Sequence, residues 1–184
     1  MAKIEDGRGK YGDAGVSVDQ RLEVSSRTAE RAFYSARDDG LAYSVTMDAM
    51  TLAAGDVAGY LKNTSSTRNL IINDIDFSGV PAGKWIVSSC SGTAAAGTAV
   101  TPTNLNLSKG NAAEASAMSG DTSITGLTAI DTIGVVRHEA LGQQEENFSS
   151  GLILGPNDAI MIEYDTGAGG LCEIVIDLHF EATP

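Results

Sequence analysis

The sequence has no long apolar run. Its first ten residues, Met1 to Lys10, lack the apolar centre of a signal peptide. No later stretch approaches the ~18 consecutive apolar residues of a membrane-spanning helix. These absences predict a chain that is neither exported by such a leader nor embedded in a bilayer.

Cysteine is also scarce. Cys90 and Cys172 are the only two, they lie far apart, and neither belongs to a CxxC pair. A zinc knuckle or a dithiol redox pair needs closely spaced cysteines, so the sequence disfavours both. We expect two small buried apolar side chains, and a single disulfide between them is the alternative.

Catalytic motifs are missing. No GxSxG elbow, HExxH helix or phosphate-binding glycine loop occurs, and the two histidines, His138 and His179, both lie in predicted strands with acidic neighbours. We expect His179 to be solvated on the outward face of its strand. The sequence therefore predicts a protein that is not an enzyme and that needs no cofactor.

Acidic residues could in principle supply oxygen ligands to calcium. Asp74 and Asp76 would project from one face of a strand, and Asn73, Asp158 or Asp165 could join them from elsewhere. No EF-hand loop is present, so we interpret these residues as a polar stripe that faces solvent and protects a sheet edge. Bound calcium is the alternative.

Positive charge is scarce overall and unevenly placed. The net charge of −12 disfavours nucleic acid as the main partner, because binding to phosphates depends on Lys and Arg. Residues 1–40 hold seven of the twelve basic residues and eight acids, a net charge of −1. Residues 41–184 hold five basic and sixteen acidic residues, a net charge of −11. The sequence thus predicts an N-terminal arm over residues 1–40 and a body over residues 41–184.

The arm offers little that could pack. Residues 1–20 are rich in glycine and polar side chains, so we expect them to become ordered only on another surface. Further along, Leu22 and Val24 suggest a short strand, and Thr28 to Arg37 suggests one or two helical turns that stop at Asp38-Asp39-Gly40.

The body reads as short strands separated by turns. The clearest strand alternates Cys172, Ile174, Ile176, Leu178 and Phe180 with mostly polar residues. Other strands are expected in these segments: 41–47, 59–63, 69–77, 85–90, 132–139, 152–154 and 159–164. The glycine-rich turn after Asp165 predicts that the last two strands pair as an antiparallel hairpin.

Residues Ser91 to Gly126 carry mostly small side chains. We expect this stretch to cover a surface and to add little to the core, and we interpret Gly92, Gly97 and Gly110 as flexible loop positions. About eight short strands with few aromatic residues predict an all-β fold, an antiparallel two-sheet sandwich of the jelly-roll kind. An up-and-down barrel is the alternative.

Several segments together resemble one protein family. From about residue 20 onward, the chain resembles capsid decoration (cement) proteins of tailed bacteriophages. The segments that carry the resemblance are Arg21-Leu-Glu-Val-Ser, Gly40-Leu-Ala-Tyr, Tyr60-Leu-Lys-Asn-Thr, Thr101-Pro-Thr-Asn-Leu-Asn and Gly155-Pro-Asn-Asp.

The resemblance implies a structural virion protein. Such a protein is made in the host cytoplasm, forms a homotrimer on the outer capsid surface, and uses its arm to staple neighbouring capsomers of the major capsid protein. Its partners would include neither nucleic acid nor a membrane. By this resemblance and by the prevalence of aromatic and Arg side chains in interfaces, the contact residues would be Arg21, Leu22, Glu23, Val24, Arg27, Arg31, Phe33, Tyr34 and Arg37. For the aromatic residues Phe33, Tyr34 and Tyr43, packing on the chain's own body is the alternative.

Two other functions stay open. A sugar- or surface-binding sandwich module of a phage tail or spike would present exposed aromatic side chains, for which Trp85 is the first candidate. An enzyme on the same fold would depend on His138 or His179. The fold alone does not decide among these functions.

Overall fold

The computed structural model describes seven stretches of the chain: residues 3–5, 11–13, 36–80, 82–120, 123–140, 142–167 and 170–182. The chain divides into two compact units, Met1–Arg31 and Ala32–Pro184. In the first unit, β1 (Lys3–Glu5) pairs antiparallel with β2 (Tyr11–Asp13). The second unit therefore begins earlier in the chain than Leu41, where the change in composition suggested a boundary.

The second unit is built almost entirely of strands. In chain order they are β3 (Ala42–Leu52), β4 (Asp56–Asn63), β5 (Arg68–Gly79), β6 (Gly83–Ala95), β7 (Thr98–Val100), β8 (Thr103–Asn104), β9 (Ala115–Ser119), β10 (Thr125–His138), β11 (Gly142–Leu154), β12 (Ala159–Gly167) and β13 (Gly170–Ala182). Each strand segment that the sequence predicted in the body overlaps one of them, and only Leu41 and Glu139 of those segments lie outside.

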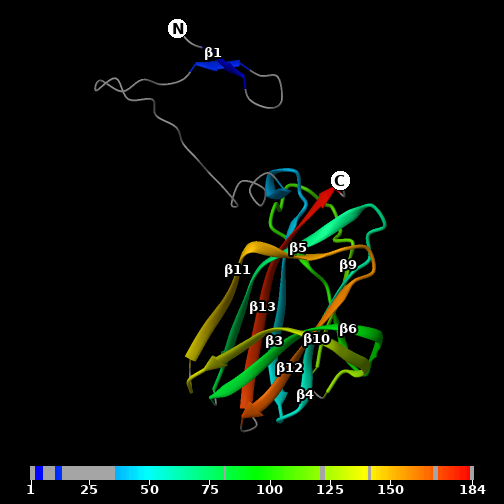
Figure 1. The fold of residues 1–184 in the computed structure, drawn as a ribbon, viewed down its shortest axis with the longest axis vertical. Helices are drawn as coiled ribbons and strands as arrows, with labels where there is room; N and C mark the ends of the chain where they lie inside the picture. Colours follow the sequence, from blue (N-terminus) through cyan, green and yellow to red (C-terminus); the bar gives the residue numbers. More distant parts are fainter. Residues whose placement is uncertain are drawn as a thin grey trace, which may run out of the picture. The chain divides into compact units, whose positions relative to one another are not determined.

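These strands form two antiparallel sheets that face each other (Figure 1). One has the order β10-β6-β12-β4-β9-β7 and the other has the order β11-β5-β13-β3-β8. Among the eight long strands, every connection except that from β6 to β10 passes from one sheet to the other. This is the strand order of a jelly roll, so the predicted all-β sandwich is confirmed.

The predicted pairing of the last two strands is wrong. β12 pairs with β4 and β6, whereas β13 pairs with β3 and β5 in the other sheet. The glycine-rich segment after Asp165 therefore carries the chain across the sandwich. A short turn of this composition serves a crossover as well as a hairpin, so the local sequence could not separate the two.

The main core lies between the sheets. The alternating residues of β13 from Cys172 to Phe180 are all buried there, as predicted. Phe77 of one sheet packs against Trp85 of the other with ring centroids 5.2 Å apart, and Tyr164 lies 4.8 Å from Trp85. Burying one such side chain contributes about 1.5–3 kcal/mol, so this aromatic contact joins the two layers strongly.

A second, smaller apolar cluster lies on the other face of the six-stranded sheet. In β12, Ile160 and Ile162 belong to the main core, whereas Met161 belongs to the second cluster with Tyr60 and Cys90. Successive side chains of a strand point to opposite faces, which places this cluster on the outer side of the sheet. The six-stranded sheet is thus covered on both faces along part of its length.

The stretch from Ser91 to Gly126 is more ordered than predicted. It contributes the end of β6, the start of β10, and the three short strands between them. β9 extends one sheet beside β4, and β8 extends the other sheet beside β3. The stretch adds few large side chains to the core, as expected, but it covers the β3 and β4 side of the sandwich.

Gly92 lies within β6, so its interpretation as a loop position is wrong. Its φ is +107°, and a Cβ at this position would lie 2.2 Å from the carbonyl oxygen of Gly126. Gly92 pairs with Leu127 beside a register shift between β6 and β10. The two backbones approach so closely here that only glycine fits both the conformation and the space.

We predict that Gly92→Ala destabilises the body by roughly 2 kcal/mol or more, because it adds both a clash and backbone strain. Gly110→Ala is the matched control: a Cβ at Gly110 meets no atom within 4 Å, and its φ is not positive. Denaturant unfolding of the two variants measures the difference. Equal stability of both variants would contradict the close approach at Gly92.

Candidate attachment junction

The entry into the body is a capped helical turn. Ala36–Asp38 form the turn, and the chain leaves it through Gly40, whose φ is +75°. The N–H of Gly40 donates to the carbonyl of Arg37 at 3.0 Å, and the N–H of Leu41 donates to that of Ala36 at 2.6 Å. This pair of bonds is a Schellman motif, which confirms the predicted stop of the helix at Gly40.

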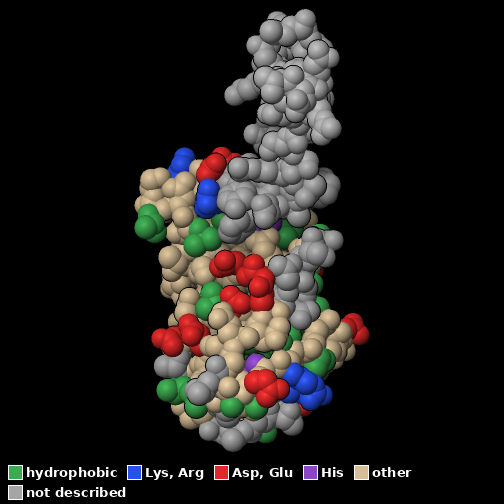
Figure 2. All heavy atoms as spheres, turned by 90° about the vertical axis from the view of Figure 1, so that its left-hand side faces the viewer, with side chains coloured by type: hydrophobic (Ala, Val, Ile, Leu, Met, Phe, Trp, Pro, Cys, Tyr) green, Lys and Arg blue, Asp and Glu red, His purple; other side chains and the backbone are tan. Residues whose placement is uncertain are grey.

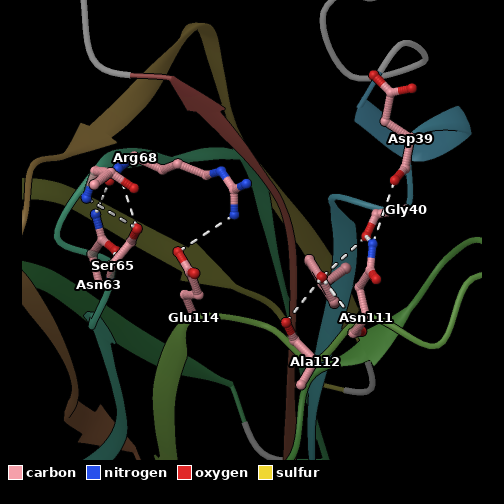
Figure 3. Close-up of polar contacts among 10 residues, drawn as sticks. Asp39, Gly40, Asn63, Ser65, Arg68, Asn111, Ala112 and Glu114 are labelled. Carbon is pink, nitrogen blue, oxygen red and sulfur yellow. Dashed lines mark hydrogen bonds and ion pairs between the residues drawn. The ribbon is translucent and has the colours of Figure 1, made fainter.

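The carbonyl oxygen of Gly40 accepts hydrogen bonds from β3, β8 and the loop before β9. Figure 3 shows Gly40 beside Asn111 of this loop, whose Nδ2 lies 3.4 Å from the oxygen. The hydroxyl of Tyr43 on β3 lies 3.1 Å from it, and Nδ2 of Asn104 on β8 lies 2.9 Å from it. The same Nδ2 group also lies 3.1 Å from the carbonyl oxygen of Asn111. We call Gly40, Tyr43, Asn104, Asn111 and Ala112 the junction.

The junction is completed by the loop between β8 and β9. The hydroxyl of Tyr43 also lies 3.3 Å from the carbonyl oxygen of Ala112, and its single hydrogen serves one of these acceptors at a time. Nδ2 of Asn106 donates to the carbonyl of Asp38 at 3.2 Å. A Cβ at Gly40 would lie 2.6 Å from Cβ of Lys109, so the loop packs directly on the entry.

A pocket of about 280 Å³ adjoins the junction. Arg68 of β5 and Glu114 form an ion pair of 3.6 Å on its wall, and both side chains are partly exposed. Burial raises the pKa of the Tyr43 hydroxyl, Arg68 acts to lower it, and Glu114 acts to raise it. Tyr43 therefore stays neutral and available as a donor at physiological pH.

The turn between β4 and β5 is held by one buried amide (Figure 3). Nδ2 of Asn63 donates to the carbonyls of Arg68 and Leu154, each at 2.9 Å, and its Oδ1 accepts from the N–H of Ser65 at 2.9 Å. This side chain has no exposed surface. It therefore fixes the backbone from which Arg68 extends toward Glu114.

The outer face of the five-stranded sheet is acidic. Asp74 and Asp76 alternate with the core residues Ile75 and Phe77, so their carboxylates point outward. Figure 2 shows Asp and Glu side chains gathered near the middle of the face on the β11 side. The carboxylates of this face are those of Asp48, Asp74, Asp76, Glu145, Glu173 and Asp177.

Burial and the neighbouring carboxylates raise the pKa of Asp74. Burial, followed by the charges of Asp177, Asp76 and Glu145 in that order, raises the pKa of Asp74 to about 6. Asp177 lies directly opposite Asp74 in the ladder, a cross-strand pair of like charges that is unfavourable when both are ionised. The ionised carboxylates of the predicted polar stripe therefore repel one another at neutral pH.

The residues considered for calcium are not brought together. Asp158 accepts from the N–H of Gly155 in a turn at 3.0 Å, and Asp165 pairs with Lys84 at 2.6 Å. Across the described residues, no group of three or more His, Cys, Asp or Glu side chains is arranged to hold a metal ion. A pocket of about 550 Å³ does lie at one end of the acidic face, rimmed by Val80 and Leu171.

The expected solvation of His179 is wrong, because the residue is only 3% exposed. β13 is a central strand, and His179 lies between Ala42 of β3 and Ile71 of β5 in the sheet. Burial lowers the pKa of His179, while its bond of 3.3 Å to Glu181 acts to raise it. Folding thus favours the neutral imidazole, and this contribution to stability falls as the pH drops below about 6.5.

His138 is also buried. Its Nδ1 lies 3.1 Å from the carbonyl oxygen of Glu139, and its Nε2 has no hydrogen-bond partner among the described residues. A nucleophilic mechanism needs a hydroxyl or thiol bonded to the base, and His138 has none in this part of the chain. Cys90 and Cys172 are free and buried, as predicted, and burial raises the pKa of both thiols.

Of the predicted contact residues, the structure describes only Arg37. Its side chain is 42% exposed and lies 3.7 Å from the carboxylate of Asp38. The other eight lie outside the described residues: Arg21, Leu22, Glu23, Val24, Arg27, Arg31, Phe33 and Tyr34. The junction itself was not predicted, although Gly40 within Asp-Asp-Gly and the recurring Asn residues after Thr103 were visible signals.

No family model, curated protein or solved structure matches this chain. Within the described residues, none of the helical segments has the length and apolar character needed to cross a membrane.

We predict that Tyr43→Phe and Asn104→Ala each lower the free energy of unfolding by about 1 kcal/mol, because each removes a hydrogen bond to Gly40. Since both bonds share one carbonyl, the double variant should deviate from additivity by about 0.5 kcal/mol or more. Denaturant unfolding of the four proteins measures this coupling. Tyr60→Phe, in the second cluster, is the control, and its effect on the free energy of unfolding should be additive with that of Asn104→Ala. Additive effects in both double-mutant cycles would contradict the shared acceptor.

We predict that Asp74→Asn stabilises the body at pH 7 and has little effect at pH 4. The pKa of Asp74 is raised on folding, so the native state binds more protons than the unfolded state between about pH 4 and 6, and stability falls as the pH rises through this range. Thermal unfolding of both proteins from pH 4 to 8 measures the difference. A stability gain that is constant across this range would contradict the raised pKa of Asp74.

Proposed function

We propose that this chain is a structural virion protein that binds the outer surface of a phage capsid. The arm of residues 1–40, Arg37 included, makes the contacts with the major capsid protein, and the jelly-roll body stays on the outside of the shell. The protein staples neighbouring capsomers and so stabilises the head. It acts by binding and catalyses no reaction.

The junction is the observation that supports this proposal most directly. Gly40 is held by β3, β8 and the loop before β9, so the body itself fixes the point at which the preceding residues join it. Force transmitted through an attached arm would therefore reach both sheets. A protein that staples capsomers needs such a fixed entry, because unfolding of the residues around Gly40 under tension would lengthen the arm.

The distribution of charge also supports a binding role for the arm and an outward position for the body. Residues 1–40 hold seven of the twelve basic side chains, and Arg can bind carboxylates with two parallel hydrogen bonds. The acidic face of the five-stranded sheet repels other acidic bodies, which keeps decorated particles apart. Several arms on one particle raise the effective concentration of each, so weak single contacts give firm attachment.

The alternative function, a sugar-binding module, had Trp85 as its first candidate binding residue, and the position of Trp85 does not support it. Trp85 has no exposed surface, since it lies in the core between the sheets. Every other aromatic side chain that the structure describes is buried too: Tyr43, Tyr60, Phe77, Tyr164 and Phe180. A glycan platform needs an exposed ring, and none lies on the described surface of the body.

We predict that a chain beginning at Ala32 keeps its folded body and loses attachment to shells. Ala32 is the boundary because the capped turn at Ala36–Gly40 belongs to the body. Co-sedimentation with shells that lack this protein measures attachment, and thermal unfolding checks the fold. Full occupancy of shells by the shortened chain would refute the proposal.

A charge-reversal series makes this test sharper. Arg21→Glu, Arg27→Glu and Arg31→Glu together should abolish co-sedimentation in the full-length chain. Lys109→Glu, which reverses an exposed basic side chain of the body, is the control and should bind as the parent does. Equal loss in both variants would point to overall charge and against the arm.

A further inference from the structure

The two sides of the sandwich have very different edges. On one side the sheets end in β7 and β8, which have three and two residues. On the other side they end in β10 and β11, which have fourteen and thirteen residues. Short edge strands offer few free backbone groups, whereas a long edge strand is a template for pairing with another chain.

β10 is one of these two long edges. It pairs only with β6, so alternate N–H and C=O groups along it have no strand partner among the described residues. Three of its apolar side chains are exposed: Ile130 at 62%, Ile133 at 37% and Val135 at 50%. Apolar side chains gathered on an open edge favour an interaction with another protein surface.

We propose that two copies of this chain associate through β10, antiparallel about a two-fold axis at Gly134. In this register Asp131 lies opposite Arg137 of the second copy, and the same pair recurs on the other side of the axis. Ile133 lies opposite Val135 of the second copy in the same way. The exposed edge is therefore complementary to itself in both charge and apolar character.

The charges on this edge are available for such a contact. Both side chains are exposed, and within the described part of the chain neither Asp131 nor Arg137 has an ion-pair partner. Gly134 at the axis has no side chain, and glycine within a strand often marks a close approach of another backbone. In an isologous contact of this kind, each favourable pair of side chains occurs twice, once on each side of the axis.

The contact is short. The register of β10 against β6 shifts between Ala129 and Thr132 and again between Thr132 and Gly134, and such irregularities increase local twist. Both irregularities lie on the Asp131 side of Gly134, so residues 131–133 of each copy meet residues 135–137 of the other in a short, twisted ladder. A small interface of this kind has a Kd of about 1 mM to 1 µM, so the pairing is weak in free solution.

The pairing gives a two-fold dimer, which differs from the trimer that the resemblance implies. It does not depend on the capsid proposal, because it follows from β10 alone. The occupant of the edge is a second copy of the same chain, since the complementary residues lie within one strand. Analytical ultracentrifugation of the full-length chain at concentrations up to about 1 mM measures the oligomer.

Reversing one charge tests the register. Arg137→Asp places Asp opposite Asp, and Asp131→Arg places Arg opposite Arg. The dimerisation Kd of each variant alone should therefore be at least about tenfold higher than that of the parent. Mixing the two variants should restore dimers, because each copy then supplies the charge that the other lacks. The double variant Asp131→Arg with Arg137→Asp should also dimerise as the parent does.

Both side chains are exposed, so the variants should fold, and thermal unfolding confirms this before association is measured. A parent chain that stays monomeric at the highest concentration would overturn the proposal. A trimer, or single variants that dimerise as the parent does, would overturn it as well. Failure of the mixture to restore dimers would exclude the register about Gly134.

Discussion

Face-to-face burial of two sheets is the constraint on which the rest of the structure depends. Alternate side chains of β13, β5 and β3 must meet those of β6, β12 and β4, so consecutive long strands are placed in opposite sheets. One connection alone, from β6 to β10, stays within a sheet. This connection can therefore be long, and it contains β8 and the loop before β9, which form part of the junction.

The junction follows from where that long connection runs. It leaves β6, which lies next to the edge strand β10, crosses to the opposite edge of the sheet, and places β8 beside β3 and β9 beside β4. There it meets the entry of the chain, where Gly40 accepts hydrogen bonds from Tyr43 and Asn104. The same segment thus shortens the exposed edges on one side and fixes the entry, while β10 and β11 stay open on the other side.

Local patterns in the sequence predicted the strands well and their partners poorly. β13 was clear because its apolar residues alternate over the whole strand, and Gly40 was clear because Asp-Asp-Gly is a helix stop. His179 was misjudged because alternation gives the direction of a side chain but does not tell that β13 is central. The strands β7, β8 and β9 were missed because their Ala, Ser and Thr side chains bury little, and their pairing depends on residues far away in the chain.

The entry at Gly40 is part of the folded body, and amide hydrogen exchange of the full-length chain without any partner can measure this. The amides of Leu41 and Leu105, which donate to Ala36 and Ala42, should exchange slowly, at rates close to those of β3. Exchange of both amides at the rate of an unstructured peptide, with β3 still protected, would show that the entry is not part of the body.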